Sequence, residues 1–72
     1  MSEKNVSELL NIVEAGAGVT MQAIHFSVDD IMPVARACGK ATVPLRVEGA
    51  MDWRTQDLIA IAKAGKGQVV FV

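Results

Sequence analysis

Three nine-residue stretches decide the fold of this chain, and they align without a gap: ELLNIVEAG at residues 8–16, DIMPVARAC at 30–38 and DLIAIAKAG at 57–65. In each stretch, apolar or small residues recur at i, i+3, i+4 and i+7, which places one apolar stripe along one face of a helix. An acidic residue opens each stretch, in the first helical turn, where the helix dipole favours it. The sequence therefore predicts three amphipathic helices.

A β-prone run follows each predicted helix, at residues 19–26, 41–47 and 68–72. This alternation of helix and strand is the order that produces a parallel sheet with helical crossovers. We therefore expect an α/β fold in which three helix–strand repeats form a small three-stranded, mainly parallel sheet with helices packed on one face. We expect one domain over residues 1–72, with repeats at about 1–26, 27–49 and 50–72.

Capping residues mark the ends of the predicted helices. Ser27 suits the N-cap of the second helix with Asp30 as its capping-box partner, and Asp52 is the candidate cap of the third. The candidate caps of the first helix are Ser2, Asn5 and Ser7. We expect the helices to stop at residues able to adopt a positive φ, namely Gly16, Gly39 and Gly65.

Two prolines interrupt this pattern. Pro33 falls inside the second predicted helix, where it removes one backbone hydrogen bond and should kink the helix. Pro44 falls inside the second predicted strand, where it cannot donate to a ladder, and this favours an edge position. Pro44 therefore predicts strand order 2-1-3 or 1-3-2.

Strand side chains alternate between the two faces of a sheet. Alignment of the strands by their helix ends predicts the side that faces the helices: Val19, Met21 and Ala23, then Ala41, Val43 and Leu45, then Gln68, Val70 and Val72. The other face then carries Ile24, Phe26, Val69 and Phe71 among its apolar members. Because parallel sheets seldom leave a face open to water, we expect another chain to cover these residues, most simply a second copy in a two-fold dimer. The alternative is a central third strand with both faces buried within one chain.

Trp53 and Arg54 lie at the start of the third predicted helix and are our further candidates for a partner interface, because both residue types are frequent at binding hot spots. The other reading of Trp53 is simple packing of its ring on apolar neighbours.

Ligands of open parallel sheets bind beyond the carboxyl ends of the strands. This rule gives an alternative ligand site made of His25, Asp29, Asp30 and Asp52, with a histidine able to serve as a base or half of a metal site. The competing explanation is structural, since Asp29 and Asp30 complement a helix dipole. One histidine and two adjacent acids are also weak metal ligands, so we assign no catalytic residue, metal or cofactor.

Other motifs carry less chemistry. The Gly39-Lys40 and Gly65-Lys66 pairs run from helix into strand, whereas a phosphate loop runs from strand into helix. Cys38 lies on the apolar stripe of its helix and is expected to be a small buried hydrophobe.

Composition excludes several classes of protein. The chain has 72 residues, a formal net charge of −1 and one cysteine, which leaves no internal disulfide and no basic field for nucleic acid. No apolar run approaches the ~20 residues of a membrane helix, and residues 2–5 are polar, so we expect a soluble, cytoplasmic protein without a secretory signal.

Three functional hypotheses follow. The first is a self-associating interaction or structural module, with a larger protein as a possible partner. The second is a ligand- or metal-binding enzyme with its site at a subunit boundary. The third and weakest is a nucleic-acid binder that uses a stripe of Arg36, Lys40, Arg46, Lys63 and Lys66.

Overall fold

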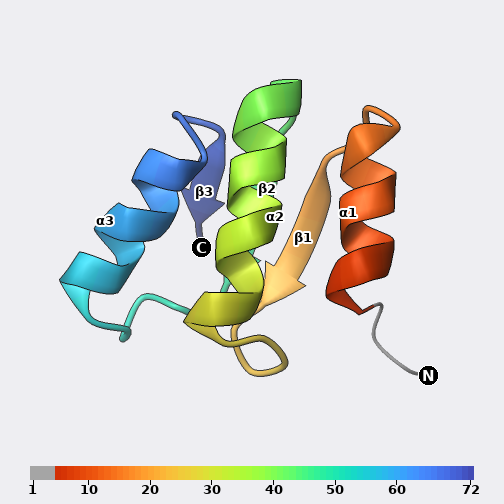
Figure 1. Cartoon of the computed structure of the whole chain (residues 1–72). Helices are drawn as coiled ribbons and strands as arrows, with labels where there is room; N and C mark the ends of the chain where they lie inside the picture. The colour runs from red at the N-terminus through yellow and green to blue at the C-terminus, as the bar shows by residue number, and fades with distance from the viewer. Residues whose placement is uncertain (1–4) are drawn as a thin grey trace.

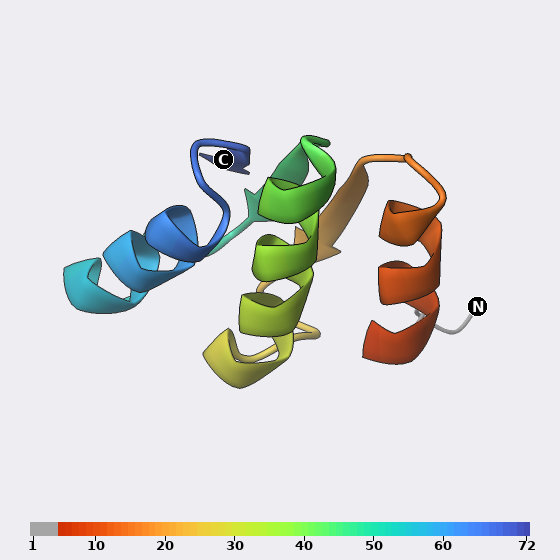
Figure 2. The same cartoon turned by 45° about the horizontal axis from the view of Figure 1, so that its top comes forward.

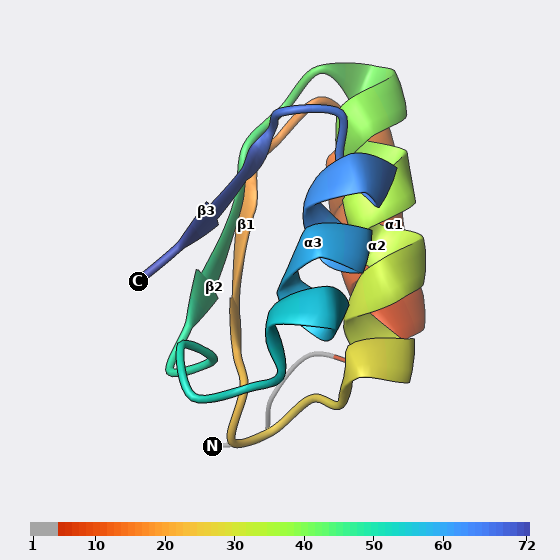
Figure 3. The same cartoon turned by 90° about the vertical axis from the view of Figure 1, so that its left-hand side faces the viewer.

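The computed structural model describes residues 5–72 and shows three helices alternating with three parallel strands. In chain order the elements are α1 (Val6–Glu14), β1 (Val19–Gln22), α2 (Val28–Ala41), β2 (Leu45–Glu48), α3 (Thr55–Ala64) and β3 (Val69–Phe71). The helices stand in a row with α2 in the middle (Figures 1 and 2). Seen from the side, the molecule has two layers, the sheet and the helices (Figure 3). None of the helices in residues 5–72 is long and apolar enough to cross a membrane.

Capping boxes open the first two helices. Ser27 caps α2 as predicted: its Oγ accepts from Asp30 N–H at 3.3 Å, and its own N–H donates to Asp30 Oδ2 at 3.1 Å. Asn5 and Glu8 make the same exchange at α1, whereas Ser7 lies inside that helix and Ser2 lies outside the described residues.

The prediction for the third cap is wrong. The N-cap of α3 is Arg54, two residues after Asp52, and within the described chain its side chain makes no capping bond. A turn over residues 51–52, with Trp53 N–H donating to the Ala50 carbonyl at 2.9 Å, delays the start of the helix.

The helices end differently from one another. Gly16 follows α1 with φ +101°, as expected. In contrast, α2 continues through Gly39 to Ala41, and its C-cap residue Thr42 takes the left-handed conformation with φ 58°. Gly65 caps α3 with a helical φ of −83°, and the positive φ falls on the next residues, Lys66 and Gly67. Gly39 and Gly65 are therefore not helix stops of the predicted kind.

Gly39 instead allows α2 to meet the end of α3 at close range. A Cβ on Gly39 would lie 2.9 Å from the carbonyl carbon and oxygen of Gly65, closer than real side chains approach. The contact is between backbones, so no side chain can rotate away to make room. Gly39 is thus required by the α2–α3 packing.

The strand order is β1-β2-β3, so the orders inferred from Pro44 are wrong. Pro44 lies one residue before β2, where a missing N–H removes no bond from the ladder between the described strands. Its carbonyl still accepts from Val19 N–H at 3.2 Å, and the bonds toward β3 begin at the next residue, where Leu45 N–H donates to the Gln68 carbonyl at 2.9 Å. Pro33, in contrast, does lie within α2, as predicted.

Both crossovers are right-handed. Viewed with the helices in front, the strands point down and the chain moves from β1 on the right to β3 on the left (Figure 1). Right-handed crossovers that advance in one direction place α2 and α3 on the same side of the sheet. The first helix, α1, precedes β1 and packs against α2 on that side (Figure 3). The helices of residues 5–72 therefore cover one face only.

The covered face holds most of the core. Parallel register aligns Leu45 with Val19 on one side and with Val69 on the other, and Val47 with Met21 and Phe71. The core is made of Leu9, Val13, Met21, Phe26, Ile31, Val34, Ala35, Cys38, Val43, Leu45, Val47, Ala50 and Ile61. Val69 and Phe71 are half-buried against this core, so their predicted place on the uncovered face is wrong.

The error is a slip of one residue in the third strand. Within the aligned stretches, α1 ends at the seventh position, Glu14, but α3 continues to the eighth, Ala64. Alignment by the stretches therefore reversed the faces of β3, because a shift of one residue exchanges every side chain between faces. Val70 and Val72 are the residues turned away from the helices, and they are 53% and 49% exposed.

We predict that Gly39→Ala destabilises the fold by about 1–3 kcal/mol, because the new methyl meets the Gly65 backbone. At an unconstrained helix position the same change stabilises by up to about 1 kcal/mol. Urea unfolding at fixed protein concentration measures the difference. Lys40→Ala, at the exposed neighbouring position, is the control and should change stability by less than about 0.5 kcal/mol. A more stable Gly39→Ala variant would contradict the packing described.

Candidate functional site

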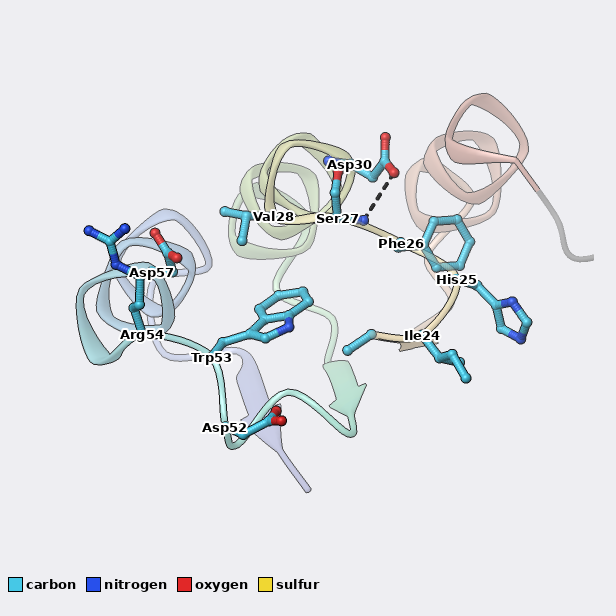
Figure 4. A pocket seen from close by; sticks show the side chains of 11 residues that line it. Ile24, His25, Phe26, Ser27, Val28, Asp30, Asp52, Trp53, Arg54 and Asp57 are labelled. Carbon is cyan, nitrogen blue, oxygen red and sulfur yellow. Dashed lines mark hydrogen bonds between the residues drawn. The ribbon is translucent and has the colours of Figure 1, made fainter.

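A hollow lies at the carboxyl end of the sheet, between the loop after β1 and the loop after β2 (Figure 4). It is open to solvent and has a volume of about 720 Å³. The structure thus brings together the two loops that the sequence singled out. The lining residues are Ala23, Ile24, His25, Phe26, Ser27, Val28, Asp30, Asp52, Trp53, Arg54 and Asp57.

Trp53 lines this hollow from the start of α3 (Figure 4). Its ring points from the start of α3 toward Val28 and the loop after β1 (Figure 4), and the side chain is half-buried against the hydrophobic core. Packing therefore accounts for much of its surface, and only part of the ring can meet a ligand or partner. Its role at an interface stays a prediction.

Arg54 lies next to Trp53 but points the other way. The guanidinium lies on the outer side of α3, away from the Trp53 ring (Figure 4), and the residue is exposed. The two residues therefore do not present one continuous surface. A partner that contacts Arg54 would approach the outer side of α3.

The acids and the histidine of the alternative ligand site point in different directions. The His25 ring is turned away from Trp53 and the centre of the hollow, while the Asp30 carboxylate accepts from Ser27 N–H at 3.1 Å (Figure 4). Asp29 is exposed and is not among the residues that line the hollow. Asp52 and Asp30 lie on opposite sides of the Trp53 ring (Figure 4). Within residues 5–72, no three His, Cys, Asp or Glu side chains gather closely enough to hold a metal ion.

Phe26 and Ile24 have opposite surroundings, although both were expected on the uncovered face. Phe26 lies past the end of β1 and belongs to the buried core, so its predicted exposure is wrong. Ile24 lies in the turn after β1 and is 85% exposed. Its side chain points away from the helices (Figure 4). Only Ile24 of this pair is free to contact a partner.

Cys38 is buried and forms part of the hydrophobic core. Its Sγ lies 4.0 Å from the Pro44 carbonyl oxygen, and burial raises the pKa of the thiol above its ordinary value. A raised pKa lowers the thiolate fraction, and the thiolate is the reactive form. The geometry gives Cys38 no role as a nucleophile.

The face of the sheet turned away from the helices is the second surface of interest, and we call it the open face. By strand alternation its side chains are Thr20, Gln22, Arg46, Glu48, Val70 and Val72. Arg46 Nε donates to Glu48 Oε2 at 3.1 Å along the central strand, with both side chains accessible to solvent. The open face therefore has a polar edge on β1, a charged middle on β2 and an apolar edge on β3.

Sequence reasoning missed three residues of this face. The second β-prone run ends at Val47 and so omits Glu48, and the alignment of the strands places Val70 and Val72 on the helix side. The signal for Glu48 was present, since a residue two positions after Arg46 shares its face of a strand.

One of the five basic residues of the predicted stripe lies apart from the others. Arg36 and Lys40 belong to α2 and Lys63 to α3, whereas Arg46 lies on the open face and is bonded to Glu48. The sheet separates Arg46 from these three residues and from Lys66, which follows α3.

Comparison of the chain with known protein families, with curated proteins and with solved structures finds no match.

We predict that Cys38 in the native protein reacts with a thiol reagent at least about a hundred-fold more slowly than in the unfolded chain, because exposure of the sulfur requires unfolding. Absorbance of released thionitrobenzoate measures both rates, and the same protein in concentrated urea is the reference. Equal rates in the two conditions would contradict the burial described.

Proposed function

We propose that this protein is a small self-associating module that acts by protein–protein contact through its open face. The observation that carries the proposal is the one-sided cover of the sheet. The helices of residues 5–72 all lie on one face, while Val70 and Val72 remain about half exposed on the other (Figure 3). Parallel sheets are found almost only with both faces covered.

The small size of the described domain supports association. A domain of about 70 residues buries only around 60% of the surface of its unfolded chain, so one core leaves little reserve of stability. Self-association is one of the few ways in which such a chain gains more buried area. Because the sequence has one cysteine, no internal disulfide adds to the stability that the core provides.

The composition of the open face also favours a protein partner. Its apolar strip of Val70 and Val72 is flanked by the Arg46–Glu48 ion pair, and interfaces commonly combine an apolar patch with accessible polar groups. Opposite charges on the same strand give no net attraction for a polyanion. A protein surface with its own apolar patch and charged groups can contact both the apolar strip and the ion pair.

Sedimentation equilibrium tests the proposal with a charge placed on the apolar strip. The wild-type chain should show twice the 7.7 kDa mass of one chain as its concentration rises. We expect Val70→Lys to weaken self-association at least about tenfold, or ~1.4 kcal/mol, since a lysine ammonium loses hydration in the interface.

Ile59→Lys is the matched control. Ile59 is 48% exposed, close to the exposure of Val70, but it lies on α3 and not on the open face. This variant should associate like the wild type. A wild-type chain that keeps the mass of one copy up to about 1 mM, where binding would be weaker than ~4 kcal/mol, would contradict the proposed function.

A further inference from the structure

We infer that a second copy of this chain covers the open face about a two-fold axis that runs across the strands, so that each Arg46 meets the partner's Glu48. The inference rests on the proposed self-association and specifies its geometry. It follows from the rows in which the side chains of the open face are arranged.

Two rows of side chains cross the open face. Register places Thr20, Arg46 and Val70 side by side in the first row. Gln22 and Glu48 are paired in the second row. Val72 continues that row, because its N–H donates to the Val47 carbonyl and its carbonyl accepts from Gly49 N–H. Each strand thus contributes one residue to each row.

An axis across the strands, centred between the two rows, exchanges them. Arg46 then lies over the partner's Glu48, and Glu48 over the partner's Arg46. Val70 meets the partner's Val72, and Thr20 meets the partner's Gln22. Every contact joins groups of matching chemistry: opposite charges, two aliphatic side chains, or two polar side chains. Opposite charges placed in this way steer association and fix register.

An axis along the strands gives the reverse result. It places Arg46 over the partner's Arg46 and Glu48 over the partner's Glu48, and it lays the valines of β3 over the polar side chains of β1. Like charges that face each other in an interface cost several kcal/mol. The charge pattern of β2 therefore selects the axis across the strands.

An exposed side chain at one end of the sheet and a hollow at the other end are brought together by the same axis. Ile24 is two residues past Gln22, is 85% exposed and points away from the helices (Figure 4). Gly18 is two residues before Thr20, and together with Pro44 it lines a second hollow of about 420 Å³ at the amino end of the sheet. The axis across the strands carries the partner's Ile24 to this hollow.

Charge reversal in the single variants tests the axis, and mixing the variants tests whether the β2 strands of two copies face each other. Arg46→Glu makes the charged middle of the open face acidic, and Glu48→Arg makes it basic. We expect each variant alone to associate at least about tenfold more weakly than wild type, because both exchanged contacts become repulsive. An equimolar mixture should recover a dimer, because the acidic β2 then faces the basic one. The ion pair within each chain stays broken in the mixture, so recovery reports on contact between chains.

The outcomes distinguish failure of the inferred axis from failure of self-association itself. If both single variants associate as the wild type does, the inferred axis is wrong while self-association stands, since an axis along the strands gives two like-charge contacts before and after either change. If the variants weaken association but the mixture recovers none of it, Arg46 does not face the partner's Glu48. If the wild type is a monomer, the proposed function fails first. Circular dichroism of each variant checks that it is folded.

Discussion

The structure depends on the combination of a sequential strand order with right-handed crossovers. A sheet that advances as β1-β2-β3 has no point at which its order reverses, so the helices have no route to the other face. All burial achieved by the described chain is therefore one-sided. Met21, Leu45 and Val47 are fully buried on the helix side, while the residues between them in the same strands meet water.

One-sided burial explains both the tight packing of the helix layer and the character of the open face. The helices must cover three strands without help, and Gly39 lets α3 approach α2 until their backbones are in contact. On the other side, no helix dictates the side chains. That freedom permits the Arg46–Glu48 pair and the valines of β3 to form a pattern that is complementary to itself. The constraint that fixes the fold thus also creates the proposed interface.

The helices and their place in the chain could be predicted from the sequence because their signals are local. The Ser27 capping box and the i, i+3, i+4, i+7 stripe of α2 each lie within one or two turns. The face of β3 could not be predicted in this way, since it depends on α3 running one residue further than the repeat alignment implies. The role of Gly39 depends on a contact with Gly65, 26 positions away, which no local rule shows. The same holds for the candidate site. The sequence predicts which loops form it, but it does not predict that the His25 side chain turns away from its centre.

An isotope-filtered nuclear Overhauser experiment tests the central claim most directly, namely that a second copy covers the open face. A sample is mixed from chains with ¹³C-labelled methyl groups and unlabelled chains, so that only contacts between chains give signals. The account predicts cross-peaks from the Val70 methyl groups to the partner's Val72, and from Ile24 to the partner's Pro44. A dimer whose intermolecular signals all come from the helix layer, or a sample with no such signals at all, would contradict it.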